Sequence, residues 1–460
     1  MSNEQGTAQA RSERWIQGFE QWASKTPIPD WVMSARVRRV LVKLPSAPNF
    51  ITSRLGTAAP VGPRSLDIPE LPDDLKTSPG VLRDRSAEEQ SFRTRGPLPV
   101  FLALHHEAYS WYQRKTWFLN YVLYGIQKRT RLDDITEKVP TRNAAVPRVD
   151  SDPLELTRRV KAKAAELGLS AIGVTKFDPM LTFAPFLGDE AAIGDRVIVC
   201  VSEQNWAATQ TIPSTRADRA HFDSNSQVHE FALALAAFLR DLGYAARASR
   251  SNGMAVGYGV EAGLGQLGLN GQLLTPFQGS APRLAMVTTN APLLFDSPID
   301  YGIPAICDKC KSCVRNCPSG AIQSKREMHR GIYKAKVKTE RCMPIVSQAH
   351  GCGICVKVCP IQRYGLPAVI EEYKRSGNIL GKNTDELEGY VWPLDGAYYG
   401  PGKRPPAAST DAVLKPKGFL MDLQRTSKDR DLGAKWSVVQ ALDAGNQRAG
   451  SQVDSEMLGG

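Results

Sequence analysis

The stretch Cys307-Asp-Lys-Cys310-Lys-Ser-Cys313-Val-Arg-Asn-Cys317-Pro318 carries the clearest structural information in this chain. A second group ends in the same way: Cys342, Cys352, Cys355 and Cys359, followed by Pro360. Two-residue gaps let one tight loop direct three thiolates at a single iron–sulfur cluster, and a fourth cysteine before proline ligates the other cluster in two-cluster ferredoxins. The spacing therefore predicts two 4Fe-4S clusters.

Each cluster is expected to take three cysteines from one group and the fourth from the other. The expected sets are Cys307, Cys310, Cys313 with Cys359, and Cys342, Cys352, Cys355 with Cys317. A zinc ribbon would leave the third cysteine of each loop without a role, and disulfides do not fit a chain of this size without a secretory signal. The ninth cysteine, Cys200, lies in an apolar run and is expected to be inert core packing.

Composition sets broad limits on class and location. The 460 residues suffice for two or three domains, and the net charge of +11 is spread along the chain. That charge could favour an acidic electron donor or an anionic substrate, or be a generic basic surface; no nucleic-acid motif accompanies it. Residues 1–17 lack the apolar core of a signal peptide, and charged residues interrupt the apolar stretch 109–126. We expect a cytoplasmic protein with no membrane part.

Periodicity divides the chain into four parts. We expect an extended or helical N-terminal region at 1–150, an α/β core at 151–300, a ferredoxin-like module at 301–366, and a C-terminal lobe and tail at 367–460. Asp152, Pro153 and Glu155 predict a capped helix that stops at Gly168. A second helix is expected at 228–242 and buried strands at 196–201 and 283–289, an alternation typical of a sheet covered by helices. The aromatic segment 389–401 is expected to pack without strands.

A glycine-rich segment precedes the cysteines, with six glycines from Gly257 to Gly271. Glycines allow close backbone approach to a ligand or close packing of a helix on a strand. The spacing matches neither a P-loop nor a dinucleotide-binding fingerprint. From composition, a cofactor loop and a structural turn remain equal alternatives.

Three features, in their order along the chain, resemble the corrinoid-dependent reductive dehalogenases. They are the segment Glu261-Ala-Gly-Leu-Gly-Gln-Leu-Gly-Leu-Asn-Gly271, then Thr275-Pro276, then the two cysteine groups. The resemblance spans about 150–401 and is strongest to the soluble, non-exported branch. It implies a nitroreductase-like corrinoid-binding core of α/β (α+β) class with an attached ferredoxin-like module, and a base-off cobalamin near the closer cluster. The implied corrinoid-binding positions are Gly263, Leu264, Gly265, Gly268, Asn270, Gly271 and Thr275.

The resemblance also implies catalytic positions. Arg283 matches a basic side chain that would hold the leaving anion, although it could be a salt-bridged strand arginine. Asn252 matches a recurring asparagine, and Asn-Gly is equally a turn signal. The family's tyrosine has no counterpart, so His221 or His229 is the expected proton donor, with a pH profile that bends in the imidazole range. Tyr258 is the alternative, and either histidine could instead be structural.

Two other functions compete with this one. Epoxyqueuosine reductases share the broad architecture, but the acid of their Asp-Ser-Gly-Pro segment and their loop tryptophan are missing from the corresponding stretches, Ser249-Arg-Ser-Asn252 and Ala262-Gly-Leu-Gly-Gln266. A non-catalytic electron carrier would leave the glycine-rich segment without a role. The substrate is expected to be a small molecule, with an organohalide as the candidate class, and nucleic acid is not expected. Because no flavin or nicotinamide pattern follows the cysteines, electrons should come from a separate ferredoxin or flavodoxin.

Overall fold

The computed structural model describes residues 67–80, 152–182, 186–249, 252–329, 332–338, 341–342, 345–346, 349–393 and 395–405. The predicted helical stretch at 109–126 and most of the predicted N-terminal region and C-terminal tail lie outside the described residues. In the part of the chain that is described, no helix has the length and apolar character needed to cross a membrane.

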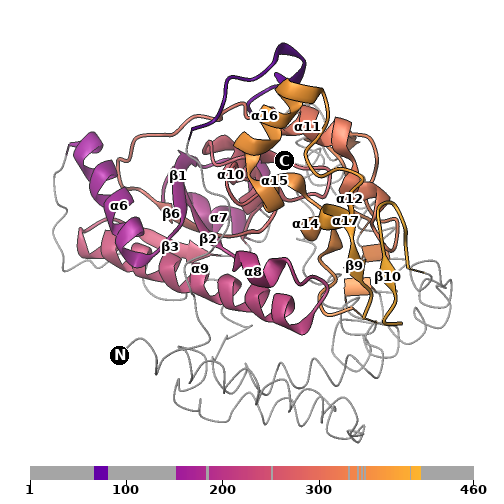
Figure 1. Ribbon diagram of the computed structural model, residues 1–460. Helices are drawn as coiled ribbons and strands as arrows, with labels where there is room; N and C mark the ends of the chain where they lie inside the picture. Colours follow the sequence, from indigo (N-terminus) through magenta and orange to yellow (C-terminus); the bar gives the residue numbers. More distant parts are fainter. Residues whose placement is uncertain are drawn as a thin grey trace, which may run out of the picture.

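A four-stranded antiparallel sheet forms the centre of the core (Figure 1). Its strands lie in the order β1 (Ala171–Lys176), β2 (Arg196–Glu203), β6 (Pro282–Thr289) and β3 (Ala246–Ser249). The two central strands, β2 and β6, are mostly buried because helices cover both faces of the sheet. The strands predicted at 196–201 and 283–289 are confirmed.

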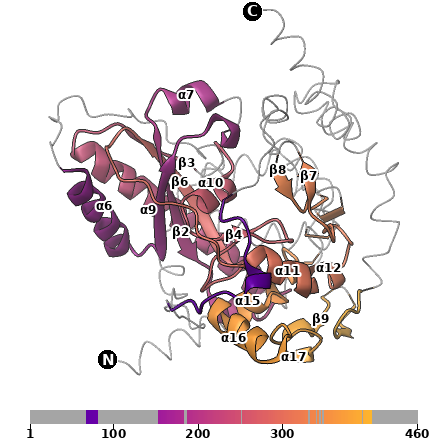
Figure 2. The same ribbon diagram turned by 90° about the horizontal axis from the view of Figure 1, so that it is seen from above.

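Helices α6 (Pro153–Leu167) and α9 (Thr215–Asp241) cover one face of the sheet, and α10 (Ala255–Glu261) covers the other (Figures 1 and 2). The predicted caps of α6 are confirmed. The Asp152 carboxylate accepts the N–H groups of Leu154 and Glu155, and Gly168 ends the helix with a φ of 92°. Helix α9 begins much earlier than the predicted residue 228, because its polar first half packs against the second cysteine group rather than against the sheet alone.

The main hydrophobic core lies between the sheet and the α6–α9 layer. Fully buried side chains from both helices, among them Val160 and Leu235, meet Ile198 and Val287 of the central strands. Cys200 belongs to this core, and burial raises the pKa of its thiol to about 12. The prediction that Cys200 is an inert core residue is therefore supported by its surroundings.

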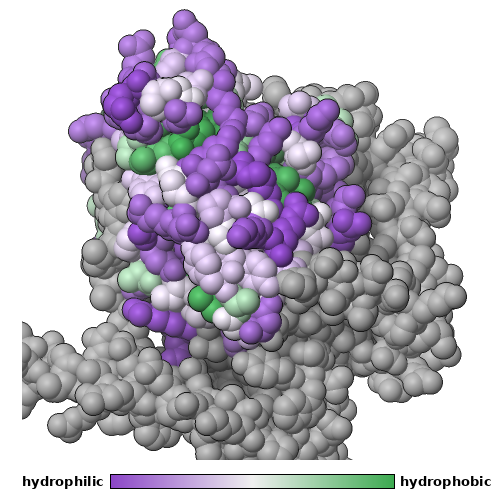
Figure 3. Space-filling view, turned by 45° about the vertical axis from the view of Figure 1, so that its right-hand side comes forward, coloured by the Kyte–Doolittle hydropathy of each residue, from purple (hydrophilic) through white to green (hydrophobic). Residues whose placement is uncertain are grey.

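The cysteine-rich module follows the core and is mostly helical. Its elements are α11 (Ile303–Cys310), α12 (Ser312–Arg315), the hairpin β7 (Glu327–His329) and β8 (Ile332–Lys334), α14 (Ile354–Lys357), α15 (Pro360–Tyr364) and α16 (Leu366–Ser376). With this side of the molecule turned forward, the described surface is mainly hydrophilic and carries only small apolar patches (Figure 3).

Residues 67–80 form a strap across this module, at α11 and α16 (Figure 2). Leu75, in the short 3₁₀ turn η2 (Asp73–Leu75), is fully buried beside Ile306 and Val369. The hydroxyl of Thr77 donates a hydrogen bond of 2.7 Å to Asp300. The strap thus joins an early segment of the chain to the junction between the core and the module.

The C-terminal lobe contains α17 (Asp385–Glu388) and a small hairpin, β9 (Tyr390–Val391) with β10 (Tyr398–Tyr399). The prediction of a lobe without strands is wrong. Tyr390 pairs with Tyr399 across the hairpin and their rings stack, an aromatic cross-strand pair that stabilises such a ribbon. The hairpin continues into Trp392, which is fully buried.

Candidate functional site

The thiols of the two cysteine groups lie close to one another. Burial is the largest cause that raises the pKa of Cys307, Cys342 and Cys352, and neighbouring thiols raise it further. Cys307 is affected in this way by Cys359, from the second group. Cys342 and Cys352 are affected by Cys317, from the first group. Cys313 and Cys355 are each affected by cysteines of both groups, so the division into two ligand sets, called here the first and second sets, stays a prediction.

These sets are not arranged around single ions. Among the described residues, no three His, Cys, Asp or Glu side chains converge as the ligands of one metal ion do. Zinc would hold its thiolates about 2.3 Å from one centre. A 4Fe-4S cluster instead binds each thiolate through a different iron atom, so its ligands stand further apart.

The loop that carries Cys352 has a conformation suited to a cluster. Four consecutive residues, from His350 to Gly353, have positive φ values between 46° and 75°. Successive N–H groups in such a loop form a concave surface that binds anionic groups, including iron–sulfur centres. Gly351 is required sterically as well, because a Cβ atom there would lie 2.5 Å from Oδ1 of Asp218 on α9. The first half of α9 therefore packs directly on this ligand loop.

Arg283 lies at the start of β6, on the face of the sheet that meets α9. Its Nη2 donates to Oε1 of Gln204 and contacts Nδ1 of His221, both at 2.6 Å. Gln204 is itself fixed, because its Nε2 donates to the buried Thr209 hydroxyl in α8 (Trp206–Thr209). Burial lowers the pKa of Arg283 to about 10 and the nearby Cys355 thiol opposes that shift, so the guanidinium stays charged at neutral pH.

The contact with Arg283 determines the protonation of His221. A guanidinium has only hydrogen-bond donors, so Nδ1 of His221 accepts and the ring proton is on Nε2. Burial lowers the pKa of His221 well below its usual value, and the charge of Arg283 lowers it further. His221 is therefore held as a neutral ring with a single N–H donor of fixed position.

His229 does not join this pair. It lies eight residues after His221 on α9, about 12 Å along the helix axis, so the two rings cannot serve the same reacting atom. The two predicted proton donors, His221 and His229, thus lie at different places along α9, and only His221 contacts Arg283.

Tyr258 lies on α10, on the opposite face of the sheet. Its hydroxyl donates to the Asp178 carbonyl at 2.7 Å, accepts from the Asp178 N–H, and contacts the Thr182 hydroxyl at 2.8 Å. Burial raises the pKa of Tyr258 far above its usual value. With its hydroxyl engaged in three contacts, Tyr258 holds the turn around η3 (Pro179–Leu181) and is poorly placed to donate a proton.

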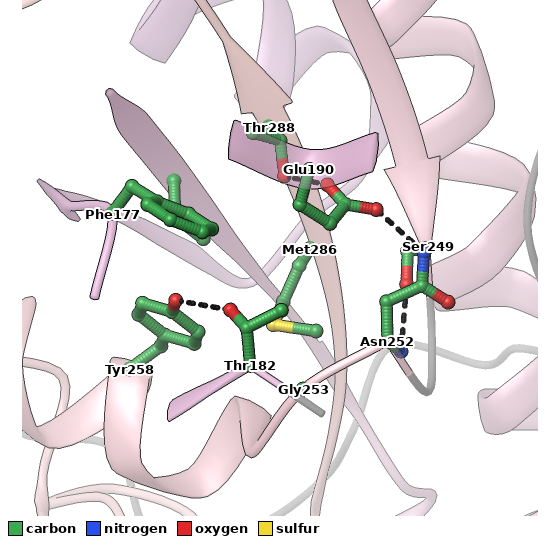
Figure 4. Close-up of a pocket in the computed structure, with 10 residues that line it drawn as sticks. Phe177, Thr182, Glu190, Ser249, Asn252, Gly253, Tyr258, Met286 and Thr288 are labelled. Atoms are coloured by element: carbon green, nitrogen blue, oxygen red, sulfur yellow. Dashed lines mark hydrogen bonds between the residues drawn. The ribbon is translucent and has the colours of Figure 1, made fainter. Parts of the chain in front are cut away.

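Asn252 lines a small pocket on the same face as Tyr258 (Figure 4). Its amide donates to Oε1 of Glu190, at the end of α7 (Leu187–Ala191), at 2.5 Å. Arg247 donates to the same oxygen at 2.9 Å, and Thr288 binds the other. The pocket has room for about one water molecule. Asn252 thus belongs to a buried network centred on the Glu190 carboxylate, away from Arg283 and His221.

The glycines of the predicted corrinoid loop pack against the protein itself. A Cβ atom at Gly263 would lie 2.4 Å from the Ser297 carbonyl oxygen, and at Gly265 2.1 Å from that of Leu274. At Gly268 it would lie 2.3 Å from the Leu274 side chain. These contacts explain the glycines as a structural turn, which joins α10 to the ribbon β4 (Gln266–Leu267) and β5 (Leu273–Leu274).

Other predicted loop residues have protein partners too. The amide of Asn270 donates to the carbonyl of Cys355 at 3.3 Å, so this residue links the loop to the second set. The Thr275 hydroxyl accepts the Gln278 N–H at 3.3 Å, and Leu264 is partly buried in the α10-side core. The positions remain predictions as corrinoid contacts.

Gln266 is a structural hub that the sequence alone did not reveal. Its Oε1 accepts the N–H groups of Tyr301 and Ile303, and its Nε2 contacts Thr77, Ser78 and Asp300. Gln266 therefore fastens the strap to the start of α11.

Four buried polar atoms, one of them on Arg283, have no partners among the described residues. Their residues belong to α8, the 275–283 segment and α15, which meet at a seam: Gln210 contacts Gln362 and Arg363, and Gly279 packs against Gln362. The atoms are Nε1 of Trp206, Oε1 of Gln278, Nε of Arg283 and Nε2 of Gln362. Buried polar atoms without partners are rare because they cost free energy, so this seam suits a ligand with hydrogen-bonding groups.

Comparison with known proteins supports the assignment of the module. The sequence model of the 4Fe-4S dicluster domain matches residues 306–363. Tetrachloroethene reductive dehalogenase from Sulfurospirillum multivorans is 30% identical over 257 residues, which cover 46% of this chain and 51% of that protein. Epoxyqueuosine reductase from Lactococcus garvieae is 29% identical over 150 residues, 31% of this chain and 42% of that protein.

Solved structures agree on the fold. The catabolic reductive dehalogenase NpRdhA has a TM-score of 0.51 at 19% identity, over 71% of this chain and 52% of that chain. A reductive dehalogenase described with a B12-dependent mechanism has a TM-score of 0.52 at 20% identity, with the same coverage. The chain spans about half the length of these relatives, or less. It thus combines a 4Fe-4S dicluster domain with a mixed α/β fold that matches reductive dehalogenase structures, and its sequence is distantly related to theirs.

Proposed function

We propose that this protein is a corrinoid-dependent iron–sulfur oxidoreductase that removes a halide, or a similar leaving group, from a small molecule. The observation that carries the proposal is the Arg283–His221 pair beside Cys355. It places a fixed positive charge and a fixed N–H donor next to a ligand of the second set. Such a pair suits a reaction in which an anion departs and a proton is added.

The residues around the pair fit a corrinoid. The partnerless atoms of the seam include both donors, on Trp206 and Gln362, and an acceptor, on Gln278. A corrinoid carries amide side chains that supply both kinds of partner, so these residues would hold its rim. When bound, it would supply the cobalt chemistry that cleaves the bond to the leaving group.

The chain's own groups have separate tasks in this proposal. The overall change consumes two electrons and one proton, replaces the leaving group by hydrogen and releases the leaving group as an anion. Arg283 would hold that anion through its charge, while Gln204 keeps the guanidinium oriented. The Nε2–H of His221 would donate a hydrogen bond that stabilises developing negative charge, and the proton that is added would come from solvent. Electrons would arrive one at a time through the second set.

The test is anaerobic reconstitution with iron, sulfide and cobalamin, followed by metal analysis and a panel of aryl and alkyl halides. We expect about eight irons and about one cobalt per chain, with halide release that depends on added reductant. Iron near four, or cobalt that washes out at every corrinoid concentration, would contradict the proposal. Full iron without cobalt would leave the alternative of a non-catalytic electron carrier.

A further inference from the structure

A short pair of extended segments lies directly over the second set. Ile322 and Val337 form an antiparallel bridge, and both pack inward with Ala335 and Cys317. Side chains alternate in extended chain, so the neighbours of Val337, Lys336 and Lys338, point outward. Both lysines are exposed.

Two arginines extend this surface at the adjoining turn. A Cβ atom placed on Gly320 would lie 3.3 Å from Nη1 of Arg404 and 3.9 Å from Nη1 of Arg341, so the two guanidinium groups flank that glycine. Both arginines are exposed. Lys336, Lys338, Arg341 and Arg404 are called here the basic face.

The basic face carries charge of one sign. Among the described residues, no carboxylate forms an ion pair with any of its four members. In the sequence from 328 to 350, five lysines and arginines accompany a single acid, Glu340. An uncompensated patch of this kind attracts negatively charged partners.

The basic face is also separated from the second set by very little protein. The Ala321 N–H donates to Sγ of Cys317 at 3.3 Å, and the Cys342 N–H donates to the Lys338 carbonyl at 3.0 Å. Cys355, of the same set, lies near Arg283, because its thiol raises the pKa of that guanidinium. A cluster held by the second set would therefore lie between the basic face and the candidate site.

We propose that the basic face is the docking surface for a small acidic one-electron carrier protein, of the ferredoxin or flavodoxin kind. Each encounter oxidises the carrier by one electron and reduces the second-set cluster by one, and two encounters supply one turnover. The destination of these electrons rests on the proposed function. The phosphate backbone of a nucleic acid would also neutralise these charges. It would, however, gain nothing from the short distance between the basic face and the ligands Cys317 and Cys342, so the observations favour an electron carrier.

The test compares two variants with the same change in net charge. Lys336→Glu/Lys338→Glu alters the basic face, and Arg158→Glu/Arg159→Glu alters exposed residues of α6, on the far side of the molecule (Figures 1 and 2). Each reconstituted protein is mixed anaerobically with reduced acidic ferredoxin, and cluster absorbance is followed by stopped flow. Photoreduction with 5-deazariboflavin, which is uncharged, measures cluster integrity independently.

At low salt we expect Lys336→Glu/Lys338→Glu to lower the ferredoxin rate about tenfold and to lose most of its salt dependence. The α6 control and the 5-deazariboflavin rates should stay within about twofold of wild type, since steering acts on the docking patch. A milder variant, Lys336→Gln/Lys338→Gln, should give an intermediate loss of the ferredoxin rate. It replaces Lys336→Glu/Lys338→Glu in the test if that variant fails to fold.

An unchanged ferredoxin rate in the basic-face variants, or an equal loss in the α6 control, overturns the proposal. Loss of transfer-RNA binding with an unchanged ferredoxin rate would also overturn it and assign the surface to nucleic acid. The absorbance readout needs neither corrinoid nor substrate. Failure to release halide would therefore count against the proposed function alone.

Discussion

Arg283 shows how a single side chain acquires a defined role from its neighbours. Its guanidinium is contacted from two sides, by an amide on Gln204 and a ring nitrogen on His221, while its Nε has no partner among the described residues. The two contacts fix the plane of the group, and the open Nε is available to a ligand. Among the described residues no carboxylate pairs with Arg283, unlike Arg196 and Arg247 of the same sheet, which form ion pairs with Asp195 and Glu190.

We predict that Arg283→Ala keeps the iron and cobalt content but lowers turnover roughly 100-fold, the usual effect of removing one preorganised charged group. Metal analysis and kcat on any accepted substrate measure this. Arg196→Ala, on the neighbouring strand β2, is the control and should stay close to wild type. Turnover of Arg283→Ala within threefold of the wild-type value would assign Arg283 a structural role.

The pH dependence expected from sequence is changed by the environment of His221. A histidine that accepts from a guanidinium in a buried site stays neutral below its usual pKa. In the unfolded chain the ring takes up a proton near pH 6.5, so the folded state loses stability as pH falls through that value. The neutral N–H form persists on acidification, and the predicted bend in the imidazole range is not expected from this residue.

We therefore predict that kcat shows no titration near pH 6.5 that depends on His221. The measurement is a pH profile of wild type and of His221→Gln, which keeps an N–H donor without a titrating ring. Both profiles should have the same shape between about pH 6 and pH 8. A wild-type bend near 6.5 that disappears in the variant would refute a neutral His221.

At the scale of elements, α12 is anchored to the C-terminal lobe by one buried carboxylate. Glu388 of α17 is fully buried and accepts from Ser312, Arg315, Asn316 and the Asn383 N–H. Burial alone would raise its pKa, but these hydrogen bonds and the charge of Arg315 hold the pKa below its usual value. Because α12 begins between Cys310 and Cys313, this anchor positions ligands of the first set.

We predict that Glu388→Ala lowers the free energy of unfolding by about 3 kcal/mol, since it leaves Arg315 and Asn316 without their buried partner. Iron content should fall toward half, through loss of the first cluster. Glu386→Ala, which removes an exposed ion pair with Arg363, is the matched control and should cost less than about 1 kcal/mol. Equal effects of the two substitutions would show that the buried anchor has no special role.

Across the whole molecule, local patterns were predictable and distant pairings were not. The caps of α6, the strands β2 and β6 and the cysteine spacing all depend on neighbouring residues, and the sequence shows them directly. The early start of α9 was missed because its first half is polar and packs on a ligand loop, and β3 because it has only four residues. The Arg283–His221 contact joins residues 62 positions apart, and a pairing over that separation leaves no periodic pattern in the sequence.

Gln266 offers a test of the strap. We predict that Gln266→Leu lowers the free energy of unfolding by about 2 kcal/mol, because buried groups of the strap and of the α11 start lose their partner. It should also make residues 67–80 sensitive to limited proteolysis. Gln272→Leu, in the same ribbon, should change neither property. Unchanged proteolysis in Gln266→Leu would mean that Leu75 and the Thr77–Asp300 contact secure the strap without Gln266.

The strap also has a consequence for the order in which the molecule is made. Thr77 is synthesised 223 residues before its partner Asp300, and the surface that buries Leu75 is complete only once Ile379 has been translated. Contacts between such distant residues form late. Both cysteine groups are translated before that point, so we expect the strap to close over the module only after all eight of their cysteines are in the chain.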